Sequence, residues 1–260
     1  MRHPTGRRLA EALFGHAMRA LPRRYRFRAA RAMAFAVPRR VVPAGVWKCA
    51  VEPARDLILW HGLQILDRCG LAYDLRIHVP GLAQLDEAVA AGRGVLLAGP
   101  HTRLSQIAVR HLRGAGYDVV AVSSPGSVPR PPRGVPHIHV SPHFLVAVRE
   151  ALVQGRVVFA QIDHEAAIPG RTVEVHTGMG KLNVSDALLR LASRCQARTL
   201  FIASRGTSDG FECTIVSPAA ESGSRPDPVG LDDFCRFLQG HVHALQGVRT
   251  AAHREHARAH

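Results

Sequence analysis

The chain has 260 residues, of which 47% are apolar, so it can bury the core of one domain, with or without a helical extension. Its formal net charge of +14 indicates an anionic partner, either a nucleic acid or a membrane surface. Aromatic residues make up only 5%, and zinc-finger spacing and an aromatic RNA-binding signature are both absent from the sequence, which argues against nucleic acid.

The first 45 residues form a basic arm. Residues 1–40 contain eleven arginines against one acid, Glu11. Between the arginines, apolar residues recur every three or four positions, as on one face of a helix: Leu9, Leu13, Phe14, Met18 and Leu21. The apolar runs are shorter than the roughly 18–20 residues of a spanning helix and too interrupted for a secretory signal. We therefore expect peripheral contact with an anionic membrane; the alternative is that the apolar face packs on the domain.

Residues 46–248 alternate between helical and strand patterns, which predicts an α/β fold with a largely parallel central sheet flanked by helices. Ser123–Pro136 is rich in Ser, Pro, Gly and Arg and is expected to be a loop, either a lip over the site or a surface loop. Residues 249–260 are expected to form a flexible His-rich tail without a native metal site. The expected helices are 51–69, 82–91, 104–114, 144–154, 184–195 and 231–248, and the expected strands are 73–79, 95–98, 119–122, 157–162, 172–175, 199–204 and 211–216.

The five cysteines are widely spaced, odd in number and without a Cys-x-x-Cys pair. This usage predicts reduced, mostly buried thiols in a cytoplasmic protein. The five are Cys49, Cys69, Cys195, Cys213 and Cys235.

The segment Gly92–Gln106 is the centre of the functional prediction. Val95–Ala98 is a short apolar run typical of a buried strand, and Gly99-Pro100 ends it. His101 is therefore expected at the carboxyl end of a strand, where open α/β sheets bind ligands and where a histidine can act as a base. The alternative is a structural histidine whose ring nitrogens are satisfied by the fold.

The pattern Gly-x-Gly-Val-Leu-Leu-x-x-Pro-His, followed by a helix, resembles the first motif of the glycerol-phosphate/lysophospholipid acyltransferase superfamily, and within it the lipid A late acyltransferases. The later order of elements is also similar over roughly residues 73–218, with Gly155-Arg156 before a strand, Asp163 at its end, Gly178, and then Ala203-Ser204-Arg205. The resemblance implies an acyltransferase-like fold and His101 as general base. Family members carry an acid five positions after this histidine, whereas this chain carries Gln106.

Acyl transfer needs a base, donors for the oxyanion and cations for phosphate. Gln106 can orient the imidazole through its amide oxygen but carries no charge, and Asp163 is the candidate to supply the missing carboxylate. The expected substrate-binding residues are Arg103, Arg171, Gly178, Lys181 and Arg205. Of these, Arg171, Lys181 and Arg205 are the candidate phosphate contacts, and Arg103 is expected beside His101.

The resulting hypothesis is an acyltransferase that moves an acyl group from an acyl carrier protein or coenzyme A thioester to a hydroxyl of a lipid or lipid-like acceptor. No cofactor, metal or nucleic acid is expected, and the location is peripheral, at the cytoplasmic face of the inner membrane. The alternative is a catalytically weakened homologue that binds lipid or acyl carrier protein without turnover.

Overall fold

The computed structural model describes residues 4–34, 52–71, 75–100, 104–123, 134–163, 172–177, 180–207, 210–218 and 230–241. By internal contacts the chain divides into two compact units. The first comprises Met1–Arg76, Gly206–Phe211 and Gln246–His260, and the second comprises Ile77–Arg205 and Glu212–Leu245.

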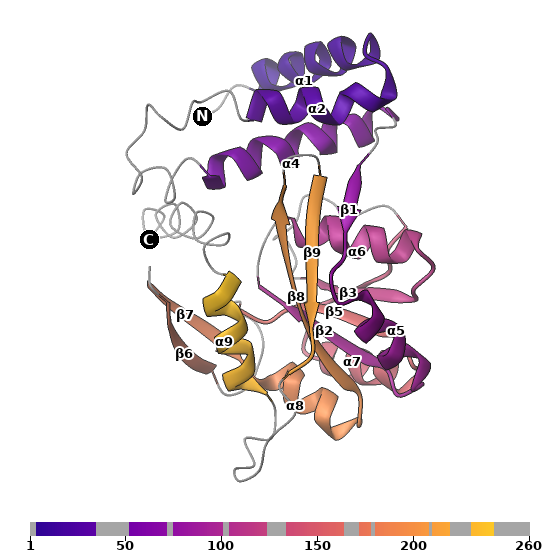
Figure 1. The fold of residues 1–260 in the computed structure, drawn as a ribbon, viewed down its shortest axis with the longest axis vertical. Helices are drawn as coiled ribbons and strands as arrows, with labels where there is room; N and C mark the ends of the chain where they lie inside the picture. Colours follow the sequence, from indigo (N-terminus) through magenta and orange to yellow (C-terminus); the bar gives the residue numbers. More distant parts are fainter. Residues whose placement is uncertain are drawn as a thin grey trace. The chain divides into compact units, whose positions relative to one another are not determined.

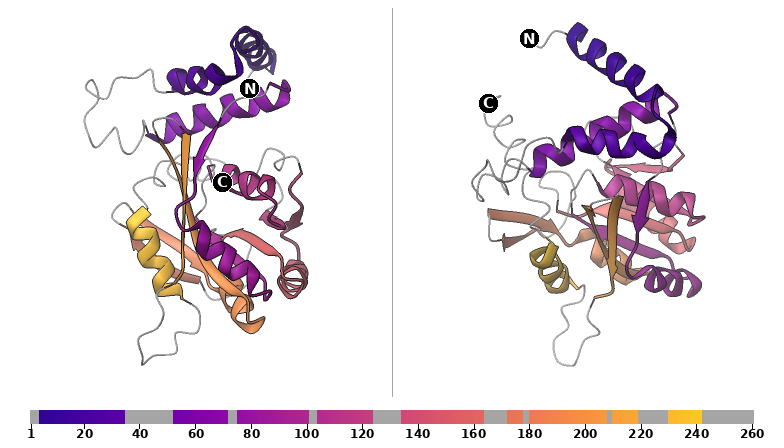
Figure 2. Two further views of the ribbon diagram at one scale, coloured as in Figure 1. Left: turned by 45° about the vertical axis from the view of Figure 1, so that its right-hand side comes forward. Right: turned by 45° about the horizontal axis from the view of Figure 1, so that its top comes forward.

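The first unit contains α1 (Pro4–Arg19), α2 (Arg23–Ala34) and α4 (Glu52–Arg68), and both α1 and α2 pack against α4 (Figure 2). Its large buried apolar residues are Met18, Phe27, Leu59, Trp60, Leu63, Leu66 and Phe211. Because α4 packs with the basic helices, this unit extends further along the chain than the 45 residues of the predicted arm.

The two basic helices follow the predicted amphipathic pattern only in part. Met18 is buried, but Leu13, expected on the same apolar face, is 62% exposed. Arg26 joins the two helices by donating from Nε to the carbonyls of Met18 (3.1 Å) and Leu21 (2.9 Å) at the end of α1, where the Met18 carbonyl also accepts from the Leu21 N–H at 3.3 Å. Among the described residues, no helix is both long enough and apolar enough to cross a membrane.

The second unit is an α/β domain with a mostly parallel seven-stranded sheet, in the order β1-β9-β8-β2-β5-β3-β4 (Figure 1). The pairings β8–β2, β2–β5, β5–β3 and β3–β4 are all parallel. β6 and β7 form a separate antiparallel ribbon. The strands are β1 (Arg76–His78), β2 (Val95–Gly99), β3 (Val119–Ser123), β4 (His137–His139), β5 (Val157–Gln161), β6 (Thr172–Thr177), β7 (Gly180–Ser185), β8 (Arg198–Gly206) and β9 (Gly210–Val216). The helices are α5 (Leu82–Ala90), α6 (Ser105–Gly114), α7 (Phe144–Val153), α8 (Ala187–Arg194) and α9 (Leu231–His241).

Each face of the sheet has its own core because successive strand residues point to opposite sides. On one face Leu96, Ala98 and Val158 pack with residues of α7, α8 and α9. On the other face Val95 and Leu97 pack with residues of α5 and α6. β2 is buried at all five positions, as expected for a parallel strand covered on both sides.

The predicted α/β class with a largely parallel sheet is therefore confirmed, and three local predictions are wrong. Val184 does not begin a helix: it is a buried residue of β7 that pairs with Val173, and α8 begins only at Ala187. The strands β4 and β7 were not predicted. The four described cysteines are free, as predicted, but only Cys213 is fully buried, whereas Cys69, Cys195 and Cys235 are half-buried; Cys49 lies outside the described residues.

Candidate functional site

The centre of the sheet contains a topological switch point. β2 and β5 are neighbours, but the chain leaves their carboxyl ends toward opposite faces. After β2 it enters α6, which packs on the α5–α6 face, whereas after β5 and the ribbon it enters α8, which packs on the α7–α9 face. Ligands of open α/β sheets bind outside the carboxyl ends of the strands at such a point.

Backbone hydrogen bonds continue beyond the strands at this end of the sheet. The Ile162 N–H donates to the Gly99 carbonyl at 3.1 Å, and the Ser185 N–H donates to the Ile162 carbonyl at 3.0 Å. The ends of β2, β5 and β7 are therefore held side by side. Gly99 is required by close approach, since a Cβ there would lie 2.8 Å from the carbonyl oxygen of Ile202.

On the α6 side, polar groups converge on the carbonyl of Pro100. The Ser105 hydroxyl donates to it at 3.4 Å, and the Gln161 amide donates to it at 3.5 Å. Gln106, which follows Ser105 in the chain, is half-buried as a whole residue. Its Oε1 atom is fully buried and has no hydrogen-bond partner in the described part of the chain. A buried acceptor without a donor typically costs about 1–3 kcal/mol, so this oxygen calls for an N–H or O–H donor.

Two buried carboxyl groups also lie at this end of the sheet. Asp163 is 4% exposed and follows β5, and Asp186 is 3% exposed and precedes α8. Asp186 Oδ2 accepts a hydrogen bond from Arg190 Nε at 2.7 Å, while its Oδ1 is buried without a hydrogen-bond partner among the described residues. The backbones of Ile162 and Ser185 are hydrogen-bonded to each other, and Asp163 and Asp186 are the residues that directly follow them in the chain.

The predicted site residues fall into two groups. Asp163 and Gln106 lie at the carboxyl ends described above, whereas His101, Arg103, Arg171 and Gly178 lie outside the described residues. Lys181 lies in β7 in register with His176, and its side chain is outside the described part.

Arg205 lies near the end of β8 and is exposed. Its guanidinium forms an ion pair of 2.6 Å with Glu212 on the adjacent strand β9. Any anion bound at Arg205 would share this guanidinium with that carboxylate.

The sequence analysis missed Ser105, Ser185 and Asp186. The signal was available for the last two, because Ser-Asp directly before an apolar helical run is typical of a helix start. Because the predicted helix began at Val184, Ser185 and Asp186 were placed within the helix and were not considered as site residues.

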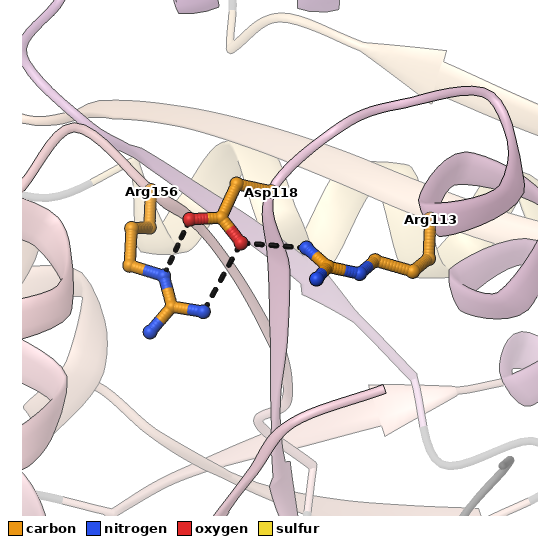
Figure 3. Close-up of polar contacts among 3 residues, drawn as sticks. All are labelled: Arg113, Asp118 and Arg156. Atoms are coloured by element: carbon orange, nitrogen blue, oxygen red, sulfur yellow. Dashed lines mark hydrogen bonds and ion pairs between the residues drawn. The ribbon is translucent and has the colours of Figure 1, made fainter. Parts of the chain in front are cut away.

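A structural ion-pair cluster lies at the opposite end of the strands, near the amino ends of β3 and β5 (Figure 3). Asp118, just before β3, accepts from Arg156 Nε at 2.8 Å and from Arg113 Nη1 at 2.6 Å. The hydrogen bonds from Arg156, with a further contribution from Arg113, lower the pKa of the Asp118 carboxyl. Because these residues lie at the amino ends of β3 and β5, the cluster ties the strands together away from the candidate site.

The buried thiol of Cys213 is not a candidate nucleophile. It lies in β9 and accepts a hydrogen bond from the Ser204 hydroxyl at 3.5 Å. Burial raises its pKa to about 11, so the thiolate is scarce near neutral pH. Within the described ranges, no three His, Cys, Asp or Glu side chains are grouped so that they could hold a metal ion.

Comparison with known proteins adds no assignment. No protein-family model matches the chain, and no curated protein matches it.

Proposed function

We propose that the protein transfers an acyl group from a thioester of acyl carrier protein or coenzyme A to a hydroxyl of a lipid or lipid-like acceptor. The carrying observation is that the Oε1 of Gln106, beside the switch point between β2 and β5, is buried and has no hydrogen-bond partner among the described residues. That oxygen needs an N–H donor, and the imidazole of His101, five residues earlier, supplies one. The resemblance of Gly92–His101 to the lipid A late acyltransferases supports the same assignment.

In this proposal the unprotonated ring nitrogen of His101 takes the proton of the acceptor hydroxyl. The oxygen attacks the thioester carbonyl and forms a tetrahedral oxyanion. The intermediate collapses with cleavage of the C–S bond, and the imidazolium returns the proton to the leaving thiolate. The products are an ester and a free thiol, and the enzyme is unchanged.

In the resembling family one acid both orients the histidine and stabilises its charged form, and here Gln106 and Asp163 are proposed to take one of these two roles each. The Gln106 oxygen fixes the tautomer and orientation of the His101 ring. Asp163, at the end of the neighbouring strand, supplies the negative charge that stabilises the imidazolium. Asp163→Asn should therefore lower kcat more than Gln106→Ala does, and the reverse ranking would contradict this division.

The basic helices are proposed to hold the protein on an anionic membrane, at the cytoplasmic face of the inner membrane. Leu13 is 62% exposed and Tyr25 is 41% exposed, with the Arg24 guanidinium 4.9 Å from the Tyr25 ring centroid. Exposed apolar side chains among arginines suit the headgroup region of anionic lipids. Co-sedimentation with vesicles that contain phosphatidylglycerol, but not with pure phosphatidylcholine vesicles, is the expected result.

A second candidate function follows from the neutrality of Gln106. An amide orients an imidazole but gives the imidazolium no ion-pair partner, and loss of such a charge in a serine protease triad lowers kcat about 10⁴-fold. A protein with this change could bind thioester or lipid as an accessory factor without turnover.

Thioester consumption separates the two functions. Wild type and His101→Ala are incubated with acyl carrier protein and coenzyme A thioesters and a lipid extract, with exposed His78→Ala as the matched control. Turnover that is lost in His101→Ala and kept in His78→Ala supports acyl transfer. Thioester or lipid binding without His101-dependent turnover supports the accessory function.

A further inference from the structure

Two histidines flank Ile138 in β4, the strand that ends the order of the seven-stranded sheet. Because successive strand residues point to opposite faces, His137 and His139 share one face of β4. Their partners in the β3–β4 register are Ala121 and Ser123, and Ala121 belongs to the core that the sheet forms with α5 and α6. The two imidazoles therefore lie on the α5–α6 face, close to the carboxyl ends of β3 and β4.

His137 has ligand capacity that the described part of the fold does not use. The residue is half-buried, but both of its ring nitrogens are fully buried, and neither has a hydrogen-bond partner among the described residues. A neutral imidazole carries one N–H donor and one acceptor nitrogen, so two polar groups are left unsatisfied. Burial, together with the nearby His139, lowers the pKa of His137, so no proton blocks its lone pair near neutral pH.

His139 is exposed, and a hydroxyl on the neighbouring strand orients its ring. Its Nδ1 lies 3.1 Å from the Oγ of Ser123, its register partner on β3. When Nδ1 donates its proton to this hydroxyl, the lone pair of the ring lies on Nε2. Metal-binding histidines are arranged in this way, with one nitrogen on the metal and the other held by a hydrogen bond.

The spacing of the two rings is close to that of a chelate. An ion about 2.0–2.1 Å from an imidazole nitrogen lies about 3.2 Å from the ring centroid, so two rings on one ion have centroids roughly 5–6 Å apart. The centroids of His137 and His139 are 6.3 Å apart, and the ring planes are nearly parallel. A small rotation of the exposed His139 ring therefore suffices to place both rings on one ion.

We propose that His137 and His139 together bind one divalent transition-metal ion of the zinc and copper group. Imidazole nitrogen suits these ions, whereas Mg²⁺ and Ca²⁺ prefer oxygen ligands. The described ranges contain no group of three His, Cys, Asp or Glu ligands, so this site differs from a four-ligand structural zinc centre. Its remaining coordination positions are open to water or to an anion, and the site does not depend on the proposed acyl transfer.

Footprinting with diethylpyrocarbonate tests the site in the full chain. The reagent modifies neutral imidazole nitrogens, and tandem mass spectrometry of the digested protein reports each histidine separately, so metal binding elsewhere in the chain does not disturb the result. In wild type, micromolar Zn²⁺ should protect His139, while the exposed His78 and His143 continue to react. Mg²⁺ at the same concentration should protect none of them, and a chelator should reverse the effect of Zn²⁺.

Three variants separate a chelate from binding to one imidazole. Ser123→Ala removes the hydrogen bond to Nδ1 and should raise the Zn²⁺ concentration for half-protection of His139 about tenfold. His137→Ala removes one of the two ligands and should raise it further. The matched control is His143→Ala, which should leave it unchanged. If His137→Ala does not fold by circular dichroism, His137→Gln takes its place, because it keeps a polar side chain without an imidazole.

Each outcome decides the question. Protection of His139 that is lost in the His137 variant and kept in His143→Ala supports the two-histidine site. Absence of protection by both Zn²⁺ and Cu²⁺ in wild type overturns it, and so does equal protection of His139 without His137. Equal protection of His78, His139 and His143 also overturns it, because it would show only weak binding to any exposed histidine. These results stand whether or not thioester is consumed.

Discussion

Replacing Gly94 by alanine should severely destabilise the α/β domain. Gly94 precedes β2 with φ +73°, and a Cβ there would lie 2.2 Å from the carbonyl oxygen of Leu152 and 2.9 Å from its carbonyl carbon. Two costs combine. Alanine in the left-handed region costs about 1–2 kcal/mol, and the clash with a backbone oxygen forces the end of α7 away from β2. We expect a total of roughly 4 kcal/mol or more, the range reserved for severe lesions.

Gly92 is the matched control, two residues earlier in the same turn. Its φ is +70°, but a Cβ there would meet no atom within 4 Å. Gly92→Ala should therefore cost only the conformational term, about 1 kcal/mol. In urea unfolding followed by circular dichroism, with thermal melts alongside, the Tm should fall by roughly 2–4 °C for Gly92→Ala and by roughly 10 °C or more for Gly94→Ala. Equal losses for the two variants would refute the argument from close approach.

Three further predictions concern other parts of the chain. Asp118→Asn should lower the free energy of unfolding at pH 7 by only about 1 kcal/mol, because its ion pairs are largely exposed, and by less in high salt. Because folding lowers the pKa of this carboxyl, the stability difference from wild type should fade as the pH falls below about 4. A constant difference down to pH 2 would count against the pairing with Arg156. Cys213 should react with a maleimide more slowly than the half-buried Cys195 at pH 8, measured by mass spectrometry of the digested protein, and equal rates would contradict its burial and raised pKa. Arg26→Ala should increase hydrogen exchange at the end of α1, because the side-chain bonds that tie the Met18 and Leu21 carbonyls to α2 are lost, whereas unchanged exchange would show that Arg26 is not needed there.

The sequence predicted most of the sheet because parallel strands covered on both sides are short, uniformly apolar and bounded by glycine. Val95–Ala98 and Val157–Ile162 are of this kind, and the structure places strands there. His137–His139 carries one apolar residue between two histidines, so its strand character comes from pairing with β3 rather than from its own pattern.

The candidate site was predictable only where a strand ended in a polar residue. Asp163 follows an apolar strand directly and was found by that signal. Asp186 follows β7, which was not predicted and is recognised only through its pairing with β6, because Val184 fits a strand and a helix pattern equally well. Strand order also lies beyond the sequence pattern, and the neighbouring positions of β2 and β5 define the switch point.

The order of strands in the sheet also constrains how the domain can fold. β5 lies between β2 and β3, yet it is made after both of them. During synthesis, the N–H and C=O groups of β2 and β3 that face β5 therefore lack their strand partner until α7 and β5 have been made. Such late insertion of a central strand links residues far apart in the chain and is expected to make folding slow. Asp163 follows β5 in the chain, so the polar groups at the carboxyl ends of the strands come together only when this central strand has entered the sheet.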